Sequence, residues 1–404
     1  MASALSGIRV IDLTGLGPSS LVSMTMADMG AEVIKLDMPP GGGHRGVGDG
    51  LDYFPQEAEE AERMTAYVAI NRNKKSIAVN LRTEAGHRVF HKLAATCDVV
   101  IESFRPGVMD RMNVGYEALS KTNPRIIYCA VSGYGQTGPY KSLPGHDANY
   151  AGFGGVLGLT GDRKDGAPVM ALNVVADLAV AYLNATVGVL LAICGRERTG
   201  KGQLVDISMT DGVVGLLAGI PGATEYFYSG VLPQRGDTLT SGNSPFYTAY
   251  QTKDGKYVTI CPIEPRFWHN MCKALSREDL VPHEFAPSPK KEEVLEDLKK
   301  IFLTKTRDEW FDLLGKADVP VGKVLDVDEV FKDPQVVHRQ MIVDVPHPKF
   351  GAIKQVGVSI KLSDTPGKIR SLAVPLGRHT QEVLSDLGYS KADIERLRQE
   401  NVVA

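Results

Sequence analysis

The segment Ile8-Arg9-Val10-Ile11-Asp12 opens the pattern that decides the fold. This short run rich in branched residues is followed by a helical stretch from Ser19 to Met29 and then by a second run, Glu32-Val33-Ile34-Lys35-Leu36. Two such runs separated by one helix predict parallel strands joined by a crossover connection. The N-terminal residues therefore predict the first unit of a doubly wound α/β sheet.

The same alternation continues through the first half of the chain. Strands are predicted at 76–80, 98–102, 126–131 and 203–208, with helices at 84–95, near Met109, and in a long apolar stretch at 174–194. The large lobe is assigned to 1–218. Residues 219–244, rich in Gly, Pro, Thr and Tyr without clean periodicity, are assigned to a linker.

A second, smaller α+β lobe is predicted at 245–335. Runs at 246–250 and 256–261 flank the turn Lys253-Asp254-Gly255 as a hairpin, and helices follow at 265–275, 291–302 and 307–314. Residues 336–404 are assigned to a return segment that ends in an amphipathic helix packed on the large lobe.

Composition excludes several classes of function. A chain of 404 residues is longer than a single hydrophobic core usually supports, so two lobes are expected. Its 45 basic and 48 acidic side chains nearly balance and give no electrostatic argument for binding nucleic acid or membranes. The five cysteines are scattered, without C-x-x-C or zinc-site spacing, so neither disulfides nor a metal site are indicated. The first residues show no signal-peptide pattern, and the expected location is the cytoplasm.

Two residues that can carry protons are expected near glycine-rich backbone. His146 follows Gly145 and precedes the run Gly152-Phe153-Gly154-Gly155, while Asp177 lies in the first turn of the long apolar helix. A His and an Asp brought together suggest acid–base or acyl chemistry on a large ligand. Taken singly, His146 is more often a structural hydrogen bonder, and Asp177 is equally explained as a helix cap.

Several longer motifs carry a resemblance to a known family. They are Gly30-Ala31-Glu32-Val33-Ile34-Lys35-Leu36, Asn71-Arg72-Asn73-Lys74-Lys75-Ser76, Glu102-Ser103-Phe104-Arg105-Pro106-Gly107, Ser132-Gly133-Tyr134-Gly135-Gln136-Thr137-Gly138-Pro139 and Arg198-Thr199-Gly200-Lys201-Gly202-Gln203. With them the chain resembles family III CoA-transferases, the group that includes α-methylacyl-CoA racemases and formyl-CoA transferases. The resemblance implies a Rossmann-like large lobe that binds CoA, a small lobe, and two chains interlocked as a homodimer.

The resemblance implies two competing activities. His146 and Asp177 match the acid–base pair of the racemases, which move a proton at the α-carbon of an acyl-CoA thioester, and Glu264 matches a further carboxylate of that site. In the transferases the residue matching Asp177 is a nucleophile that forms an aspartyl-CoA intermediate, and the position of His146 commonly holds Tyr. The racemase activity is therefore favoured, although Ala179-Val180-Ala181 replaces the glycines usual in racemases.

A third hypothesis, a non-catalytic CoA-binding subunit of a hetero-oligomer, is disfavoured by the presence of Asp177. The resemblance implies no permanently bound cofactor and no metal, with coenzyme A present only as part of the substrate. A free carboxylic acid acceptor is needed by the transferase alone.

Binding residues are assigned on the same resemblance and on charge. Those expected at CoA are Arg105, Phe104, Lys35, Asp37, Asn73 and Lys75. Those expected to line or shield the acyl group are Gly154, Gly155 and Tyr150. Trp268, Phe246 and Tyr247 are candidates for an aromatic wall, and backbone N–H groups at the start of the Asp177 helix are candidates for stabilising an enolate. The run Gly41-Gly42-Gly43 matches no phosphate-binding motif.

Overall fold

The computed structural model describes residues 3–15, 17, 19–39, 57–161 and 166–404, so the run at 41–43 lies outside the described residues. The chain forms two compact units. The first comprises Met1–Gly154, Leu172–Val213 and Pro334–Ala404, and the second comprises Gly155–Ala171 and Val214–Asp333. The return segment and the C-terminal helices thus belong to the first unit.

A six-stranded parallel sheet forms the centre of the first unit, in the order β3-β2-β1-β4-β5-β6. The strands are β1 Arg9–Leu13, β2 Glu32–Asp37, β3 Lys74–Ala78, β4 Val99–Glu102, β5 Ile127–Ser132 and β6 Leu204–Ser208. The predicted α/β class and all six predicted strands are confirmed. The strand order reverses between β1 and β4, and ligands of such sheets bind beyond the carboxyl ends of the strands at this point.

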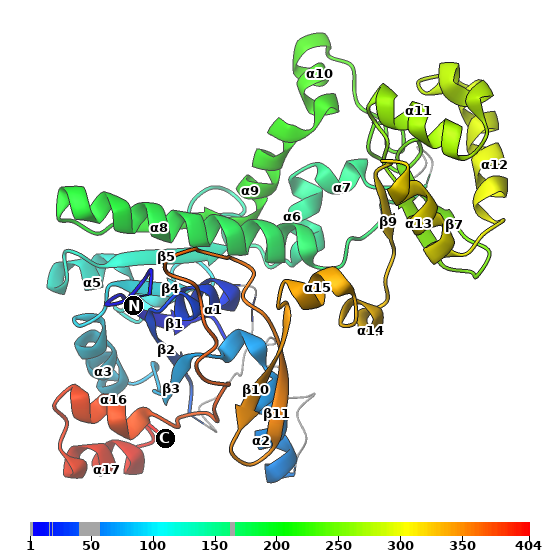
Figure 1. Cartoon of the computed structure of the whole chain (residues 1–404). Helices are drawn as coiled ribbons and strands as arrows, with labels where there is room; N and C mark the ends of the chain where they lie inside the picture. Colours follow the sequence, from blue (N-terminus) through cyan, green and yellow to red (C-terminus); the bar gives the residue numbers. More distant parts are fainter. Residues whose placement is uncertain (1–2, 16, 18, 40–56, 162–165) are drawn as a thin grey trace. The chain divides into compact units, whose positions relative to one another are not determined.

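Helices cover both faces of this sheet (Figure 1). On one face α1 (Ser20–Asp28) packs against α8 (Tyr182–Thr199), which lies over β5 and β6. On the other face a continuous apolar core joins the sheet to α3 (Glu84–Ala94), α5 (Tyr116–Thr122), α16 (Thr380–Asp386) and α17 (Lys391–Gln399). A short helix, α4 (Val108–Arg111), precedes α5.

The long apolar helix begins where the sequence predicts and ends five residues later than predicted. Its first part, Val174–Ala181, is π-helical and continues into α8. At its far end Arg196 Nη1 donates to Asp98 Oδ1 at 2.8 Å, next to the start of β4. The helix therefore runs back along the sheet, and its first turn lies at the carboxyl ends of the strands.

By length and composition, Val174–Thr199 is apolar enough to cross a membrane, but a third of its most apolar window is buried in the protein. One apolar stripe is exposed along it, formed by Leu183, Val187, Leu190 and Leu191, which is 65% exposed. The spacing of these residues places them on one side of the helix.

The C-terminal segment covers the edge strand β3. The backbone N–H of Ala78 donates to Thr380 Oγ1 at 3.1 Å, and the N–H of His379 donates to the carbonyl of Ser76 at 2.9 Å. These bonds use groups that an open edge would leave unpaired. Before this segment, α15 (Pro334–His338) leads into an antiparallel hairpin of β10 (Ile342–His347) and β11 (Gly351–Val356), next to α2 (Ala58–Tyr67).

The second unit has a three-stranded antiparallel sheet, β7 (Thr248–Gln251), β8 (Tyr257–Ile260) and β9 (Val321–Lys323). The predicted hairpin is β7–β8. Its helices are α11 (Pro265–Ala274), α12 (Lys290–Phe302), α13 (Arg307–Lys316) and the short α14 (Val327–Val330). The predicted linker 219–244 contains a helix, α10 (Pro221–Ser229), which begins with Pro at its first position, where the missing N–H costs nothing.

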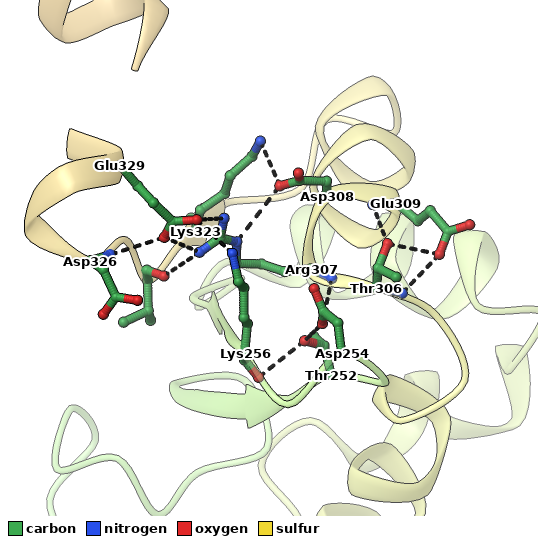
Figure 2. A network of polar contacts seen from close by, with 12 residues as sticks. Thr252, Asp254, Lys256, Thr306, Arg307, Asp308, Glu309, Lys323, Asp326 and Glu329 are labelled. Atoms are coloured by element: carbon green, nitrogen blue, oxygen red, sulfur yellow. Dashed lines mark hydrogen bonds and ion pairs between the residues drawn. The ribbon is translucent and has the colours of Figure 1, made fainter. Parts of the chain in front are cut away.

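A charged network holds the small sheet to the helices around it (Figure 2). The guanidinium of Arg307 donates two hydrogen bonds to the carboxylate of Glu329, both at 2.8 Å, and a third to the carbonyl of Val324 at 2.7 Å. Lys256, the residue immediately before β8, donates to the same carboxylate at 2.6 Å. A bidentate arginine–carboxylate pair fixes the relative orientation of its two side chains as well as neutralising their charges. This network therefore positions α14 against α13.

Candidate active site

Asp177 lies in the π-helical turn that precedes α8, and its side chain is half-buried. The first π-type bond of this turn runs from the N–H of Leu178 to the carbonyl of Asn173 at 3.3 Å. N–H groups before that bond have no partner within the helix. Two of them, those of Ala176 and Asp177, donate to one oxygen, Oδ2 of Asp147, at 2.7 and 2.9 Å.

This arrangement corrects two expectations from the sequence. The N–H groups of Ala176 and Asp177 are bound to Asp147, so these two do not stabilise an enolate. The cap of the helix is the Asp147 carboxylate, which accepts the N–H of Asp177, and Asn173 at the N-cap position makes no side-chain capping bond. Sequence reasoning missed Asp147, although it stands next to His146.

His146 immediately precedes α6 (Asp147–Phe153) and its side chain is exposed. Its backbone N–H donates to Oδ1 of Asn149 at 3.0 Å, which holds the first turn of α6 closed. Helix α6 packs against the π-helical turn, and the imidazole interacts electrostatically with the Asp177 carboxylate. The structure therefore places His146 and Asp177 in one neighbourhood, and their catalytic roles stay predictions.

The pKa of Asp177 is raised from 3.8 to about 6, first by burial and then by the negative charge of Asp147. His146 acts in the opposite direction. A carboxyl group with a pKa near neutrality exchanges protons more readily in both directions than an ordinary aspartate does. The site thus holds a carboxyl group suited to proton transfer.

Tyr150 on α6 is buried, and its hydroxyl donates to the carbonyl of Gly145. A Cβ atom at Gly133 or Gly145 would lie 2.2 or 2.6 Å from this ring, so both positions require glycine. Burial, followed by the charge of Asp177, raises the pKa of Tyr150 to about 12. Tyr150 is therefore a neutral wall of the site beside Asp177.

Aromatic rings gather around Tyr150. Tyr134 packs edge-on against Tyr150 and Phe153, with ring centroids 5.2 and 5.5 Å apart, and Tyr140 contacts both Tyr134 and Phe153. Phe153 is 55% exposed. This cluster was missed as a site feature, although Tyr134 lies in a motif that the sequence analysis singled out.

Phe104 and Arg105 follow β4, beside the point where the strand order reverses. The backbone N–H of Phe104 donates to Oε2 of Glu102 at 2.6 Å, which fixes the start of this loop. Arg105 is exposed and interacts electrostatically with Tyr150. The structure therefore places Arg105 in the same neighbourhood as Tyr150 and Asp177.

The remaining residues expected at CoA separate onto two faces of the sheet. Lys35 and Asp37 form an ion pair with each other on the face of Asp12, with which Lys35 is in register. Lys75 is in register with Ile34 and so points to the opposite face, because side chains alternate along a strand. There it binds Glu32 at 3.1 Å and Glu382 at 2.8 Å.

Asn73 is engaged within the protein. Its amide nitrogen donates to Oδ1 of Asp28 at 2.7 Å and to the carbonyl of Lys368 at 2.8 Å. Its amide oxygen accepts the N–H groups of Arg370 and Ser371 at 2.6 and 2.9 Å. These bonds clamp the return segment to β3, so neither Asn73 nor Lys75 is brought together with Arg105.

The other predicted site residues lie at or beyond the boundary of the first unit. Gly154 is close-packed, since a Cβ there would lie 2.3 Å from Val213, and the chain passes into the second unit at Gly155. Glu264, exposed before α11, belongs to the second unit, so its catalytic role stays a prediction. Trp268, 1% exposed, and Phe246 are not an aromatic wall, because both are buried in the core of that unit.

Glu102 provides a stability test for the loop that carries Arg105. Glu102 as a whole residue is only 4% exposed, and burial raises the pKa of its carboxyl group from 4.5 to about 8. The folded protein thus holds a proton that the unfolded chain releases between these values, so wild-type stability falls as pH rises through this window. In Glu102→Gln, whose amide oxygen still accepts from Phe104, the unfolding free energy should gain about 1 kcal/mol per pH unit relative to wild type.

The measurement is denaturant unfolding at pH 5.5, 7 and 8.5. Glu117→Gln, at an exposed carboxylate on α5, is the control and should follow wild type. Parallel pH curves for wild type and Glu102→Gln would show that the Glu102 carboxyl is ionised throughout.

Comparison with known proteins identifies the class of protein. The model of CoA-transferase family III matches residues 5–380, and the chain belongs to this family of enzymes, which act on acyl-CoA thioesters. The chain is 32% identical to the α-methylacyl-CoA racemase of Homo sapiens over 412 residues, covering 99% of this chain and 97% of the relative.

Relatives with the alternative activity are equally similar. The succinyl-CoA:glutarate CoA-transferase of Mus musculus is 32% identical over 405 residues, covering 99% of this chain and 90% of the relative. Among solved structures, a CaiB/BaiF family protein from Brucella suis matches with a TM-score of 0.79 and 29% identity, covering 96% of this chain and all of that one.

Proposed function

We propose that this enzyme is an acyl-CoA racemase that moves a proton at the α-carbon of a 2-methylacyl-CoA thioester. The observation that carries this proposal is the pairing of His146 with Asp177, two proton carriers held together by α6 and the π-helical turn. Racemisation removes the α-proton on one face of the carbon and returns a proton on the other, so it needs two such groups.

The chemistry of the two residues fits this division of roles. The pKa of Asp177 is raised to about 6, so the carboxyl group takes or gives a proton at moderate cost near neutral pH. The imidazole of His146 is exposed and therefore accessible to a substrate. Arg105, a planar cation near the pair, is proposed to bind CoA phosphates, with Phe104 beside it. Lys35 and Asp37, at the end of β2, are proposed to line the same crevice.

CoA transfer between carboxylic acids is the second candidate. It is supported by the transferase relatives and by the half-exposed position of the Asp177 carboxylate, which a nucleophile requires. In this mechanism Asp177 attacks the thioester carbonyl and releases CoA thiolate, and the thiolate then attacks the aspartyl carbonyl to give an aspartyl-CoA thioester and the free acid.

One experiment separates the two activities. A single enantiomer of a 2-methylacyl-CoA is incubated with the enzyme in deuterated buffer, with and without succinate as a free acid. Deuterium at the α-carbon with loss of optical purity, independent of succinate, supports the racemase. Formation of succinyl-CoA without α-exchange would establish the transferase instead. If neither α-exchange nor succinyl-CoA is observed, both candidate activities are overturned.

A homodimer is proposed as the working form. The exposed stripe of Leu183, Val187, Leu190 and Leu191 is the kind of contiguous apolar surface that marks an interface. We expect a particle of twice the 43.7 kDa chain mass by light scattering. Paired Val187→Glu and Leu191→Glu substitutions should yield monomer, and Lys361→Glu, on an exposed segment, should not. A monomeric wild type at micromolar concentration would contradict the proposal, and flotation with lipid vesicles would point to a membrane surface.

A further inference from the structure

The Asp147 side chain caps the π-helical turn at the very residue, Asp177, that carries the candidate catalytic carboxyl group. Its side chain is 5% exposed, and Oδ2 accepts the backbone N–H groups of Ala176 and of Asp177 itself. Residues 147 and 177 are 30 positions apart in the chain. The bond to the Asp177 N–H fixes the backbone from which the Asp177 side chain projects.

The neighbour of Asp147 gives this bond a further consequence. His146 is joined to Asp147 by one planar peptide bond, so its backbone moves with that of Asp147. One dipeptide therefore carries the imidazole and also holds the turn that carries the facing carboxyl group. Any change in the Asp147 bonds alters the separation of the two groups.

The charge of Asp147 also needs an explanation. Asn, Ser and Thr cap helices about as well as Asp does. A buried carboxylate is costly, and a second carboxyl group next to it adds repulsion. A neutral cap would avoid both costs.

We propose that Asp147 is a positioning residue, which holds Asp177 beside His146 through these two backbone hydrogen bonds. The inference rests on the proposed function for the catalytic role of Asp177, and it covers both candidate activities. The negative charge of Asp147 has a separate effect, because this charge disfavours ionisation of Asp177 and so keeps a proton available on the Asp177 carboxyl group.

The groups that face Asp177 set the limits of this effect. Asp147 and Tyr150 come from α6 and His146 from the residue before it, and Arg105 after β4 acts on Tyr150. Burial is the largest cause of the raised pKa of Asp177, and Asp147 is the second. Removing the Asp147 charge should therefore lower that pKa from about 6 without restoring 3.8.

Two variants separate position from charge. Asp147→Asn keeps an oxygen that can accept both N–H groups but removes the charge, so kcat at its pH plateau should stay within about threefold of wild type. Asp147→Ala removes both bonds, and displacement of a catalytic group typically costs roughly 10²-fold in kcat, with little change in KM for the acyl-CoA. Full kcat in the alanine variant would overturn the positioning role.

The pKa of Asp177 is measured directly by carbon NMR of aspartate side chains, with its signal assigned by loss in Asp177→Asn. In Asp147→Asn we expect this pKa to fall, because the repulsion from one nearby negative charge is lost. Asp206→Asn is the matched control, since Asp206 also accepts a backbone N–H, that of Gln136, and should leave the titration unchanged. An unchanged pKa in Asp147→Asn would overturn the inference even if that variant is fully active.

The outcomes keep the inference distinct from the proposed function. A lowered Asp177 pKa in an enzyme that shows neither α-exchange nor CoA transfer would leave Asp147 acting on Asp177 and remove the proposed activities. If the wild type is active, the pKa of Asp177 is unchanged in Asp147→Asn and Asp147→Ala is fully active, the proposed function stands and the positioning role of Asp147 is overturned.

Discussion

Asp177→Ala should lower the activity of this enzyme by at least 10²- to 10⁴-fold, whether the assay is α-proton exchange or CoA transfer. A positioned acid–base group is worth about this much, and a lost nucleophile at least as much. The fold should be unaffected, because the cap of the π-helical turn is Asp147 and its bonds involve only the backbone of Asp177. The measurement is kcat/KM with a panel of acyl-CoA thioesters.

Stability provides an independent readout for the same residue. The pKa of Asp177 is raised in the folded state, so ionised Asp177 opposes folding, and wild-type stability falls as pH rises from about 4 to about 6. Asp177→Asn should therefore equal or exceed wild type in Tm above pH 6. Asp386→Asn, an exposed carboxylate on α16 at the opposite face of the sheet, should change neither activity nor this pH dependence. Activity of Asp177→Ala within about tenfold of wild type would remove Asp177 from the mechanism.

The sheet could be predicted from the sequence because its signals are local. Each parallel strand, such as β2 or β5, is a short run of branched apolar residues, and each run is followed by a helical pattern. The hairpin β10–β11 was not predicted, since strands such as Ile342–His347 mix polar and apolar residues and include a proline. The same holds for α10, whose residues show no regular apolar spacing.

The site was predicted only as far as individual residues can reveal it. His146 and Asp177 were found from residue type and family motif, and the structure brings them together. The Asp147 bond was not found, because nothing in a sequence pairs a side chain with N–H groups 30 residues away. The split of Lys35 and Lys75 onto opposite faces follows from strand register, which the isolated motifs do not contain. Trp268 and Phe246 were misassigned, since an aromatic residue of a small core looks like one of a pocket wall.

His146→Ala is expected to lower racemisation by about 10²- to 10⁴-fold and to lower CoA transfer much less. With one of the two bases removed, Asp177 alone can still take and return a proton on its own face of the α-carbon. The variant should therefore incorporate deuterium into one enantiomer of the substrate without inverting it. This exchange without inversion is the signature that a general loss of binding or folding does not produce.

The fold of the variant should be preserved, because the backbone N–H at position 146 still donates to Asn149 Oδ1, which keeps this half of the capping box of α6. His338→Ala, at an exposed histidine on α15 in the same unit, is the matched control and should racemise as wild type does. Chirality and deuterium content are read by mass spectrometry after separation of the enantiomers. If His146→Ala racemises at a near-normal rate, the two-base mechanism fails. If wild type shows no racemisation and His146→Ala transfers CoA at the wild-type rate, the transferase becomes the function of this enzyme.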